Sequence, residues 1–238
     1  MLKFINKLIA FLKTKRKNNA LKHFYTSLIR ENDLCFDIGA NVGEKSLIYL
    51  RLKAKVIAFE PQSQCLPYLK KIKIKYSNFK YEQLAIADEN KYGELIIGNH
   101  IEIATMSQKF VNFFKSESIF WNEKEPVKIV TLDSQIEKWG IPEFCKIDAE
   151  GAEYLILKEL SYPIPTIEFE FTNGFIDEAL LILTKIDILS TYEYNYILNE
   201  FPIWKIKNWV DKETLIKIIQ RLPKNKLHGN IYAKLKTV

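Results

Sequence analysis

Two glycines lie four residues apart, at Gly39 and Gly43, directly after an apolar stretch that contains one acid, Asp37. Apolar residues then resume at helical spacing, so the sequence predicts a strand, a tight turn and the first turn of a helix. Glycines let the backbone approach a ligand that a Cβ would repel, and the free N–H groups at a helix start can donate to it. We therefore expect this turn to hold a ligand.

The charges beside the turn narrow the choice of ligand. A dinucleotide site has three glycines where this turn has two, and the Gly-Lys-Ser/Thr step of a phosphate-binding loop is missing. Asp37 precedes the turn, and the next predicted strand, residues 55–60, ends on Glu60, where such folds hold a ribose. Two carboxylates around a glycine turn repel a pyrophosphate and suit a positively charged nucleoside. S-adenosylmethionine (SAM) is such a molecule.

Further acids gather where another apolar stretch ends. Residues 144–148 predict a buried strand that ends on Asp148, and Glu150 and Glu153 follow directly. Carboxylates in this position can take a proton from a hydroxyl or hold Mg²⁺ through their oxygens. They can also act only as favourable charges at a helix start, worth about 0.3–1 kcal/mol each. That explanation suits Glu153 better than Asp148, so Asp148 and Glu150 are the candidate catalytic residues.

His100 is the third candidate base. It lies in a polar and aromatic insertion, residues 98–126, which interrupts the alternation of predicted strands and helices as a lid or acceptor loop often does. An imidazole suits proton transfer near neutral pH, although an exposed loop position without a catalytic role is the commoner case. Glu170, near the end of the predicted strand 166–171, is a further candidate base and could line an acceptor site.

Three segments together resemble the FkbM family of SAM-dependent methyltransferases. They are the turn Asp-Ile-Gly-Ala-Asn-Val-Gly at 37–43, the step Phe-Glu-Pro at 59–61, and the string Lys-Ile-Asp-Ala-Glu-Gly-Ala-Glu at 146–153. The resemblance covers roughly residues 33–172, with a weaker echo at 228–233. It implies the class I methyltransferase fold, a Rossmann-like three-layer α/β sandwich with a mostly parallel seven-stranded sheet and an antiparallel last strand.

The resemblance also implies a cofactor, a set of site residues and a reaction. The turn is expected to hold the methionine part of SAM, the acid after the second strand its ribose, and the segment after the third strand its adenine. The expected SAM site comprises Asp37, Gly39, Ala40, Asn41, Gly43, Glu60, Pro61 and Ala85. The expected reaction is O-methylation of a hydroxyl on a small-molecule or saccharide acceptor, in surface-glycan (capsule or lipopolysaccharide) biosynthesis. The saccharide can be the surface glycan itself or its nucleotide-linked precursor.

Two other functions stay open. A nucleic-acid methyltransferase would fit the fold, but the Asn/Asp-Pro-Pro-aromatic string of amino-methylating enzymes and the Pro-Cys nucleophile of cytosine C5 enzymes are missing. A protein that only binds SAM without catalysis would fit the glycine turn equally well. The formal net charge of +6 comes from lysines scattered over 238 residues, which indicates a mildly basic surface and no nucleic-acid partner.

The hydrophobic pattern predicts the elements that position these residues. We expect an N-terminal helical extension at 1–30 and the methyltransferase domain at 31–238. The predicted strands are 34–38, 55–60, 79–84, 92–97, 127–131, 144–148, 166–171, 192–198 and 229–235. Helices are predicted at 62–75, 175–188 and 212–221. A further predicted helix has Asp133 as its N-cap and runs through Trp139.

Residues 1–18 read as a basic amphipathic helix. The segment is too short to span a bilayer and lacks the cleavage site of a signal peptide. It suits either packing on the domain or a partner subunit, or peripheral contact with the inner face of an anionic membrane. Three cysteines form neither a disulfide framework nor a Cys-x-x-Cys pair, which favours the cytoplasm.

Overall fold

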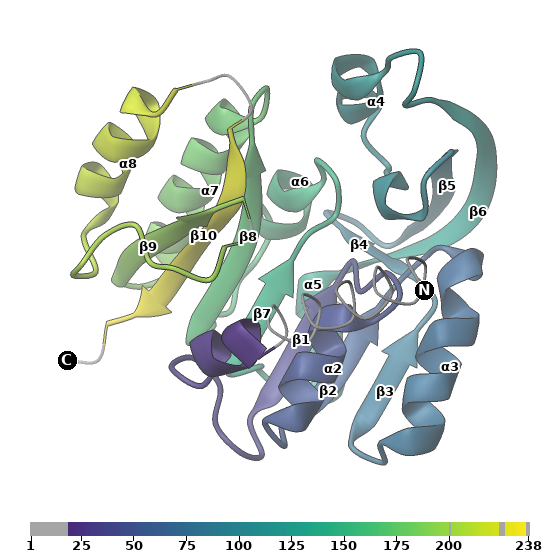
Figure 1. The fold of residues 1–238 in the computed structure, drawn as a ribbon, viewed down its shortest axis with the longest axis horizontal. Coiled ribbons are helices and arrows are strands. Elements are labelled where there is room, and N and C mark those ends of the chain that lie inside the picture. The colour runs from purple at the N-terminus through teal and green to yellow at the C-terminus, as the bar shows by residue number, and fades with distance from the viewer. Residues whose placement is uncertain (1–18, 200, 224–226, 237–238) are drawn as a thin grey trace, which may run out of the picture.

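The computed structural model describes residues 19–199, 201–223 and 227–236, so the predicted helix at 1–18 lies outside the described residues (Figure 1). Residues 19–25 are helical. The further elements, in chain order, are β1 (Leu34–Ile38), α2 (Glu44–Arg51), β2 (Lys55–Phe59), η1 (Ser63–Cys65), α3 (Leu66–Lys75), β3 (Phe79–Glu82), β4 (Ala85–Ala87), β5 (Lys91–Gly98), η2 (Ile101–Ile103), α4 (Gln108–Phe114), β6 (Trp121–Thr131), α5 (Leu132–Trp139), β7 (Phe144–Ile147), α6 (Glu153–Leu157), β8 (Thr166–Thr172), α7 (Ile176–Leu189), β9 (Tyr192–Leu198), α8 (Lys212–Arg221) and β10 (His228–Leu235). Within these ranges, no helix is both long and apolar enough to cross a membrane.

Seven strands form the main sheet, in the order β3-β2-β1-β7-β8-β10-β9. β10 runs antiparallel to both of its neighbours, whereas the pairs from β3 to β8 are parallel. This confirms the predicted fold. The chain builds outward from β1 to β3 on one side and crosses to β7 on the other, so the strand order reverses between β1 and β7. In open α/β sheets a ligand binds outside the carboxyl ends of the strands at such a switch point.

Both faces of the main sheet are covered by helices, because alternate residues of each strand point to opposite faces and both faces carry buried apolar residues. Phe36 and Ile38 of β1 join the cluster that α5, α6, α7 and α8 cover. Cys35 of the same strand joins the second cluster, which residues 19–25, α2 and α3 cover. The result is the predicted three-layer sandwich.

A smaller sheet, β4-β6-β5, carries the insertion (Figure 1). β6 begins at Trp121, so the predicted start at residue 127 was wrong: residues 121–126 pair antiparallel with β5. Proline and exposed charged side chains hid this strand from the hydrophobic pattern. Pro126 is tolerated because β4 pairs only with residues 129–131, which leaves β6 as an edge strand at the proline.

The predicted N-cap of α5 was also wrong. The cap is Thr131, whose side-chain oxygen accepts a hydrogen bond from the backbone N–H of Ser134 at 3.2 Å. Asp133 lies in the first turn of the helix instead, and its carboxylate accepts from the backbone N–H of Ser161 at 3.1 Å. A threonine competes well for the cap position, and an acid is equally favourable one turn later.

Candidate active site

A cavity of about 280 Å³ opens at the switch point. The carboxyl ends of β1, β2 and β7 form one wall, and β4, β5 and the insertion form the other. Six of the eight residues expected at the SAM site line it: Gly39, Ala40, Asn41, Glu60, Pro61 and Ala85. Asp37 and Gly43 do not line it.

The two glycines of the turn are needed for protein packing. A Cβ on Gly39 would lie 1.8 Å from the backbone oxygen of Asp148, and one on Gly43 would lie 2.4 Å from Cδ1 of Ile72. Both residues also have positive φ angles, +68° and +84°, which side chains disfavour. The missing side chains therefore let the turn pack against the end of β7 and against α3. The expected place of Gly43 at the ligand is corrected, because it faces α3, whereas Gly39 also lines the cavity.

Asp37 does not line the cavity; its side chain is buried beneath the turn, against α2 and β7. Its side chain is fully buried, and one carboxylate oxygen accepts a hydrogen bond from Ser46 Oγ at 2.5 Å. The other lies 3.6 Å from Nζ of Lys146. A carboxylate at the end of a buried strand needs such partners, because an unpaired buried charge is very costly. Its expected place at the ligand is thus corrected to a supporting one.

Glu60 lies at the cavity wall just after β2. One carboxylate oxygen accepts from the backbone N–H of Asn41 at 2.7 Å and the other from that of Gln62 at 2.8 Å. Burial raises the pKa of Glu60, and these two backbone bonds act in the opposite direction. Carboxylate oxygens have further lone pairs, so Glu60 is held in place and can still accept bonds from a ligand.

Lys146 is a buried cation among these acids that the sequence reasoning did not single out. Its Nζ donates to the backbone oxygen of Gly39 at 3.0 Å and lies 3.2 Å from Oδ2 of Asp148. Burial acts to lower the pKa of Lys146, but the carboxylates of Asp148 and Asp37 raise it above its ordinary value. Its signal in the sequence was a lysine inside the otherwise apolar run 144–147.

Further polar residues lie beside Asp37 and Lys146 on the neighbouring strands of the sheet. Asp37 lies opposite Lys146, Lys146 opposite Glu168, and Glu168 opposite Tyr232. The hydroxyl of Tyr25, from the helix at 19–25, donates to Glu168 at 3.0 Å. We call Asp37, Lys146, Glu168 and Tyr232 the polar row. These residues form one continuous line of polar side chains across four neighbouring strands of the sheet.

Three acids meet at the carboxyl edge of the sheet, and we call Asp148, Glu150 and Glu170 the acid cluster. One carboxylate oxygen of each lies within 4.8 Å of the others. Burial and the negative charge of Asp148 raise the pKa of Glu150 well above its ordinary value, and the pKa of Glu170 is raised for the same reasons. Asp148 is the member of the cluster that pairs directly with Lys146.

The backbone at Glu150 is held in a left-handed conformation, φ 51°, which is uncommon for a residue with a side chain. Thr105 Oγ1 of the insertion donates to the backbone oxygen of Glu150 at 2.7 Å. The carboxylate of Glu153 accepts from the N–H groups of Ala149 at 2.7 Å and Gly151 at 3.1 Å. Glu153, whose pKa burial raises to about 7, thus holds the loop that presents Glu150.

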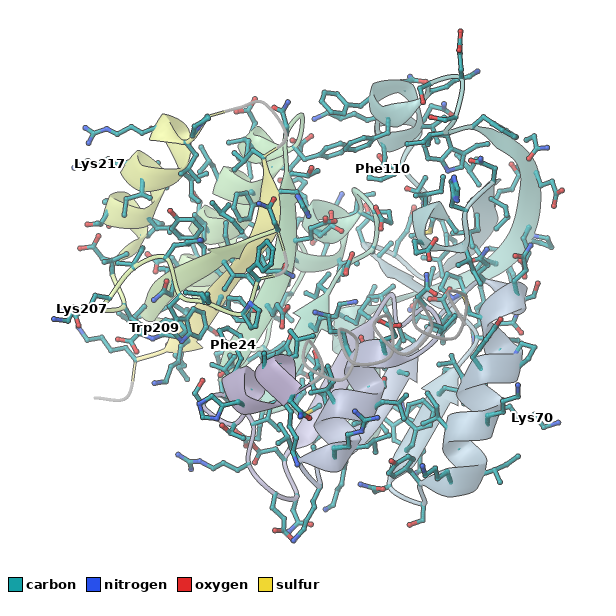
Figure 2. The ribbon with its side chains drawn as sticks, in the orientation of Figure 1. Phe24, Lys70, Phe110, Lys207, Trp209 and Lys217 are labelled. Atoms are coloured by element: carbon teal, nitrogen blue, oxygen red, sulfur yellow. The ribbon has the colours of Figure 1, made fainter. Side chains whose placement is uncertain are left out.

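A second cavity, of about 420 Å³, adjoins the first, and Glu150 lines both. Aromatic side chains of α4 line one side and residues after β8 and at the start of β10 the other. Figure 2 shows Phe110 on the side of α4 that faces the main sheet, where it is buried. Glu170 also lines this cavity, at the end of β8 as its position in the strand suggested.

His100 is not brought to the acid cluster. It precedes η2, is exposed, and lines neither cavity. The insertion does reach the site through other residues: Ile101, Ala104, Thr105 and Met106 line the first cavity. Asn41 Nδ2 donates to the backbone oxygen of Ile101 at 3.1 Å, which ties the insertion to the glycine turn.

This sheet order, with a glycine turn and an acid after β2 at its switch point, defines a class I SAM-dependent methyltransferase. A model of the family described as "Methyltransferase FkbM domain" matches residues 37–198, more than half of the chain. The chain belongs to this family, as the sequence motifs indicated. No curated protein sequence shows significant similarity to it.

Several solved structures have a related chain path. The chain is similar to a precorrin-6Y C5,15-methyltransferase from Geobacter metallireducens, with 11% identity, a TM-score of 0.49, and coverage of 90% of this chain and 86% of that one. It is also similar to a precorrin-8W decarboxylase from Methanobacterium thermoautotrophicum, with 10% identity, a TM-score of 0.46, and coverage of 90% of this chain and 89% of that one. A SAM-dependent O-methyltransferase from Thermotoga maritima has 10% identity, a TM-score of 0.46, and coverage of 92% of this chain and 66% of that one. At these values the likenesses say nothing about the acceptor.

Proposed function

We propose that this methyltransferase transfers the methyl group of SAM to a hydroxyl oxygen of a small-molecule or saccharide acceptor. The observation that supports this most is the position of Glu150, which lines both cavities. A donor in the first cavity and an acceptor in the second would meet beside a carboxylate. A hydroxyl is a poor nucleophile, and such a group can remove its proton.

The first cavity fits SAM by its charge and by its free polar groups. Its lining contains five acids (Glu44, Glu60, Glu102, Asp148 and Glu150) and two lysines (Lys45 and Lys146), a balance that suits a cationic ligand. Gln62 also lines it, and the buried amide nitrogen of Gln62 has no protein hydrogen-bond partner, which leaves a donor for a ligand. We propose that Glu60 accepts from the ribose hydroxyls, while Gly39, Ala40 and Asn41 hold the methionine part and Pro61 and Ala85 flank the adenine.

SAM, when bound, supplies a methyl group on a positively charged sulfur, and its transfer leaves the neutral thioether S-adenosylhomocysteine (SAH). Glu150 would accept the hydroxyl proton as the new oxygen–carbon bond forms. Burial and the negative charge of Asp148 raise the pKa of Glu150, which makes its ionised carboxylate a stronger base. Asp148, paired with Lys146, would position the loop and the hydroxyl.

The acid cluster also meets the requirements of a divalent-cation site. Three carboxylate oxygens within 4.8 Å of one another are a donor set that Mg²⁺ accepts, with water completing its coordination. We keep Mg²⁺ as a second way to activate the hydroxyl, because a cation lowers the pKa of a bound oxygen. Activity that is lost in EDTA and restored by Mg²⁺ would support the cation, and activity unchanged in EDTA would support Glu150 as the base.

A labelled-methyl experiment tests the reaction. The protein is incubated with methyl-labelled SAM and fractionated cell extract, and the labelled pool is identified by mass spectrometry. We expect the label in an alkali-stable methyl ether of a neutral metabolite or glycan, and a loss of about 10²-fold or more for Glu150→Gln. Label in nucleic acid would overturn the proposal in favour of a nucleic-acid methyltransferase, and SAH binding without label in any fraction would favour a non-catalytic SAM-binding protein.

A surface-glycan context and a cytoplasmic location complete the proposal. The three cysteines are buried and unpaired, which supports a reducing compartment.

A further inference from the structure

The second cavity has two chemically different parts. Its reacting end carries Glu150, Glu170 and His228, and Thr172 and Asn173 add neutral polar groups beside them. Its far wall is apolar and comes largely from α4. The lining of this cavity therefore combines a few polar groups that can fix hydroxyls with a broad apolar surface, as binding sites for small neutral ligands do.

The apolar wall packs against the loop that follows β8. The ring of Phe113 packs on the backbone of Gly174: a Cβ added to Gly174 would lie 2.6 Å from Cε2 of that ring. The same loop carries Phe175, whose ring is 6.0 Å from that of Phe110 and 6.3 Å from that of Phe113. Phe113 is still 47% exposed, so part of its ring is free to contact a ligand.

The charge of this cavity excludes one class of acceptor. Among the described residues that line it there is no lysine and no arginine, and His228 is the one side chain able to carry a positive charge. Two carboxylates face the same space, and Asp148 lies within reach of both. A phosphate placed here would meet like charges, and the described lining offers it no lysine or arginine to pair with, so its binding is disfavoured.

We propose that the second cavity is the acceptor site and that it selects an uncharged ring compound whose hydroxyls point to Glu150 and Glu170 while one apolar face of the ring lies on Phe113. Nucleotide-linked and phosphorylated forms of the same acceptor are rejected. This inference rests on the proposed methyl transfer, because it identifies the acceptor of that reaction by charge and shape.

Ligand-observed NMR tests this selectivity without knowledge of the natural acceptor. Saturation-transfer difference spectra are recorded with SAH present, in EDTA and at mildly alkaline pH. The probes are methyl and benzyl glycosides of several neutral hexoses, each compared with the 1-phosphate of the same hexose. We expect signals from neutral glycosides and signals about tenfold weaker or absent from the phosphates. Phosphates that bind as well as the glycosides, or the absence of binding by every neutral probe, would overturn the inference.

Two variants connect the binding to this cavity. Phe113→Ala is expected to remove most of the glycoside signal, whereas Phe120→Ala, which changes an exposed aromatic of the same insertion outside the cavity lining, is expected to keep it. Equal signals from both variants would place the glycoside elsewhere and overturn the inference. Calorimetric titration of SAH into the same samples distinguishes a failure of this inference from a failure of the proposed function. A variant that has lost only the acceptor site still binds SAH, whereas failure of the wild-type protein to bind SAH refutes the proposed function itself.

Discussion

The backbone oxygen of Asp148 lies where a side chain on Gly39 would have to stand, 1.8 Å from the position of its Cβ. The turn after β1 and the end of β7 are thus packed against each other without room for one methyl group. Because Gly39 lines the first cavity and Asp148 belongs to the acid cluster, this contact sets the position of the glycine turn relative to the acids.

Gly39→Ala is therefore expected to move β7 away from the turn. We expect a loss of at least about 2 kcal/mol in the free energy of unfolding, from the positive φ and the overlap, and at least tenfold weaker SAH binding. Denaturant titration and calorimetry measure the two effects. Gly140→Ala is the matched control, because its φ is +94° but its nearest neighbour is 3.8 Å away. That control should lose stability while SAH affinity stays the same; equal affinity in both variants would contradict the prediction.

Glu60→Ala is expected to weaken SAM binding tenfold or more, because hydrogen bonds from the ribose to a charged group contribute about 1.5–3 kcal/mol each. Calorimetric titration with SAM measures the affinity. Glu125→Ala is the control: it removes a carboxylate that accepts a hydrogen bond from the backbone N–H of Ser63 and does not line the cavity. This variant should bind SAM with the affinity of the wild-type protein. An unchanged affinity in Glu60→Ala would remove Glu60 from the site.

Lys146→Met leaves the buried carboxylate of Asp37 and the adjoining Asp148 without their cation. We expect the free energy of unfolding to fall by about 3–5 kcal/mol, as when one partner of a buried ion pair is removed. Denaturant titration provides the value, and adding Asp37→Asn should recover part of the loss. Lys53→Met breaks an exposed pair with Glu31 and should change little. Similar losses in the two lysine variants would refute the central role of Lys146.

Glu170→Gln is expected to stabilise the protein at neutral pH. Burial and the charges of Asp148 and Glu150 raise the pKa of Glu170, so the folded state binds its proton more tightly than the unfolded chain does. The charged form therefore destabilises the folded state above the raised pKa, and this penalty disappears below about pH 4, where both states are protonated.

Denaturation midpoints from acidic to alkaline pH, in EDTA, check this sign. The stabilising effect of Glu170→Gln should grow with rising pH, whereas Glu117→Gln, a change at an exposed position, should show no such trend. A variant that is less stable than the wild type at neutral pH would contradict the prediction.

The sequence predicted most of the main sheet because its strands are apolar runs bounded by polar turns. β1, β9 and α8 have the predicted bounds, and β7, β8 and β10 differ by one residue. The short strand β4 was missed: the predicted strand 79–84 ends at Glu82, and residues 85–87 pair instead with β6, a strand whose first half the charged and proline residues conceal. Such pairing depends on a partner distant in the chain.

The site was predictable where a motif specifies it and not where the topology assembles it. Asp148 and Glu150 stand in one short string, but their approach to Glu170 follows from the pairing of β7 with β8. The buried place of Asp37 depends on Lys146 from the neighbouring strand, which no local pattern reveals. His100 shows that residue type alone does not identify a catalytic group: its imidazole suits proton transfer, but it lies at an exposed position of the loop.

The hydrogen bond from Thr105 to the backbone of Glu150 limits how this enzyme can be re-engineered. A loop transplanted from a relative to alter acceptor choice would replace the anchor of Glu150, the proton acceptor that we propose, together with the aromatic side chains of α4. Chimeras should therefore retain a hydroxyl donor at position 105, or the exchanged module will recognise its new substrate with a misaligned reaction centre.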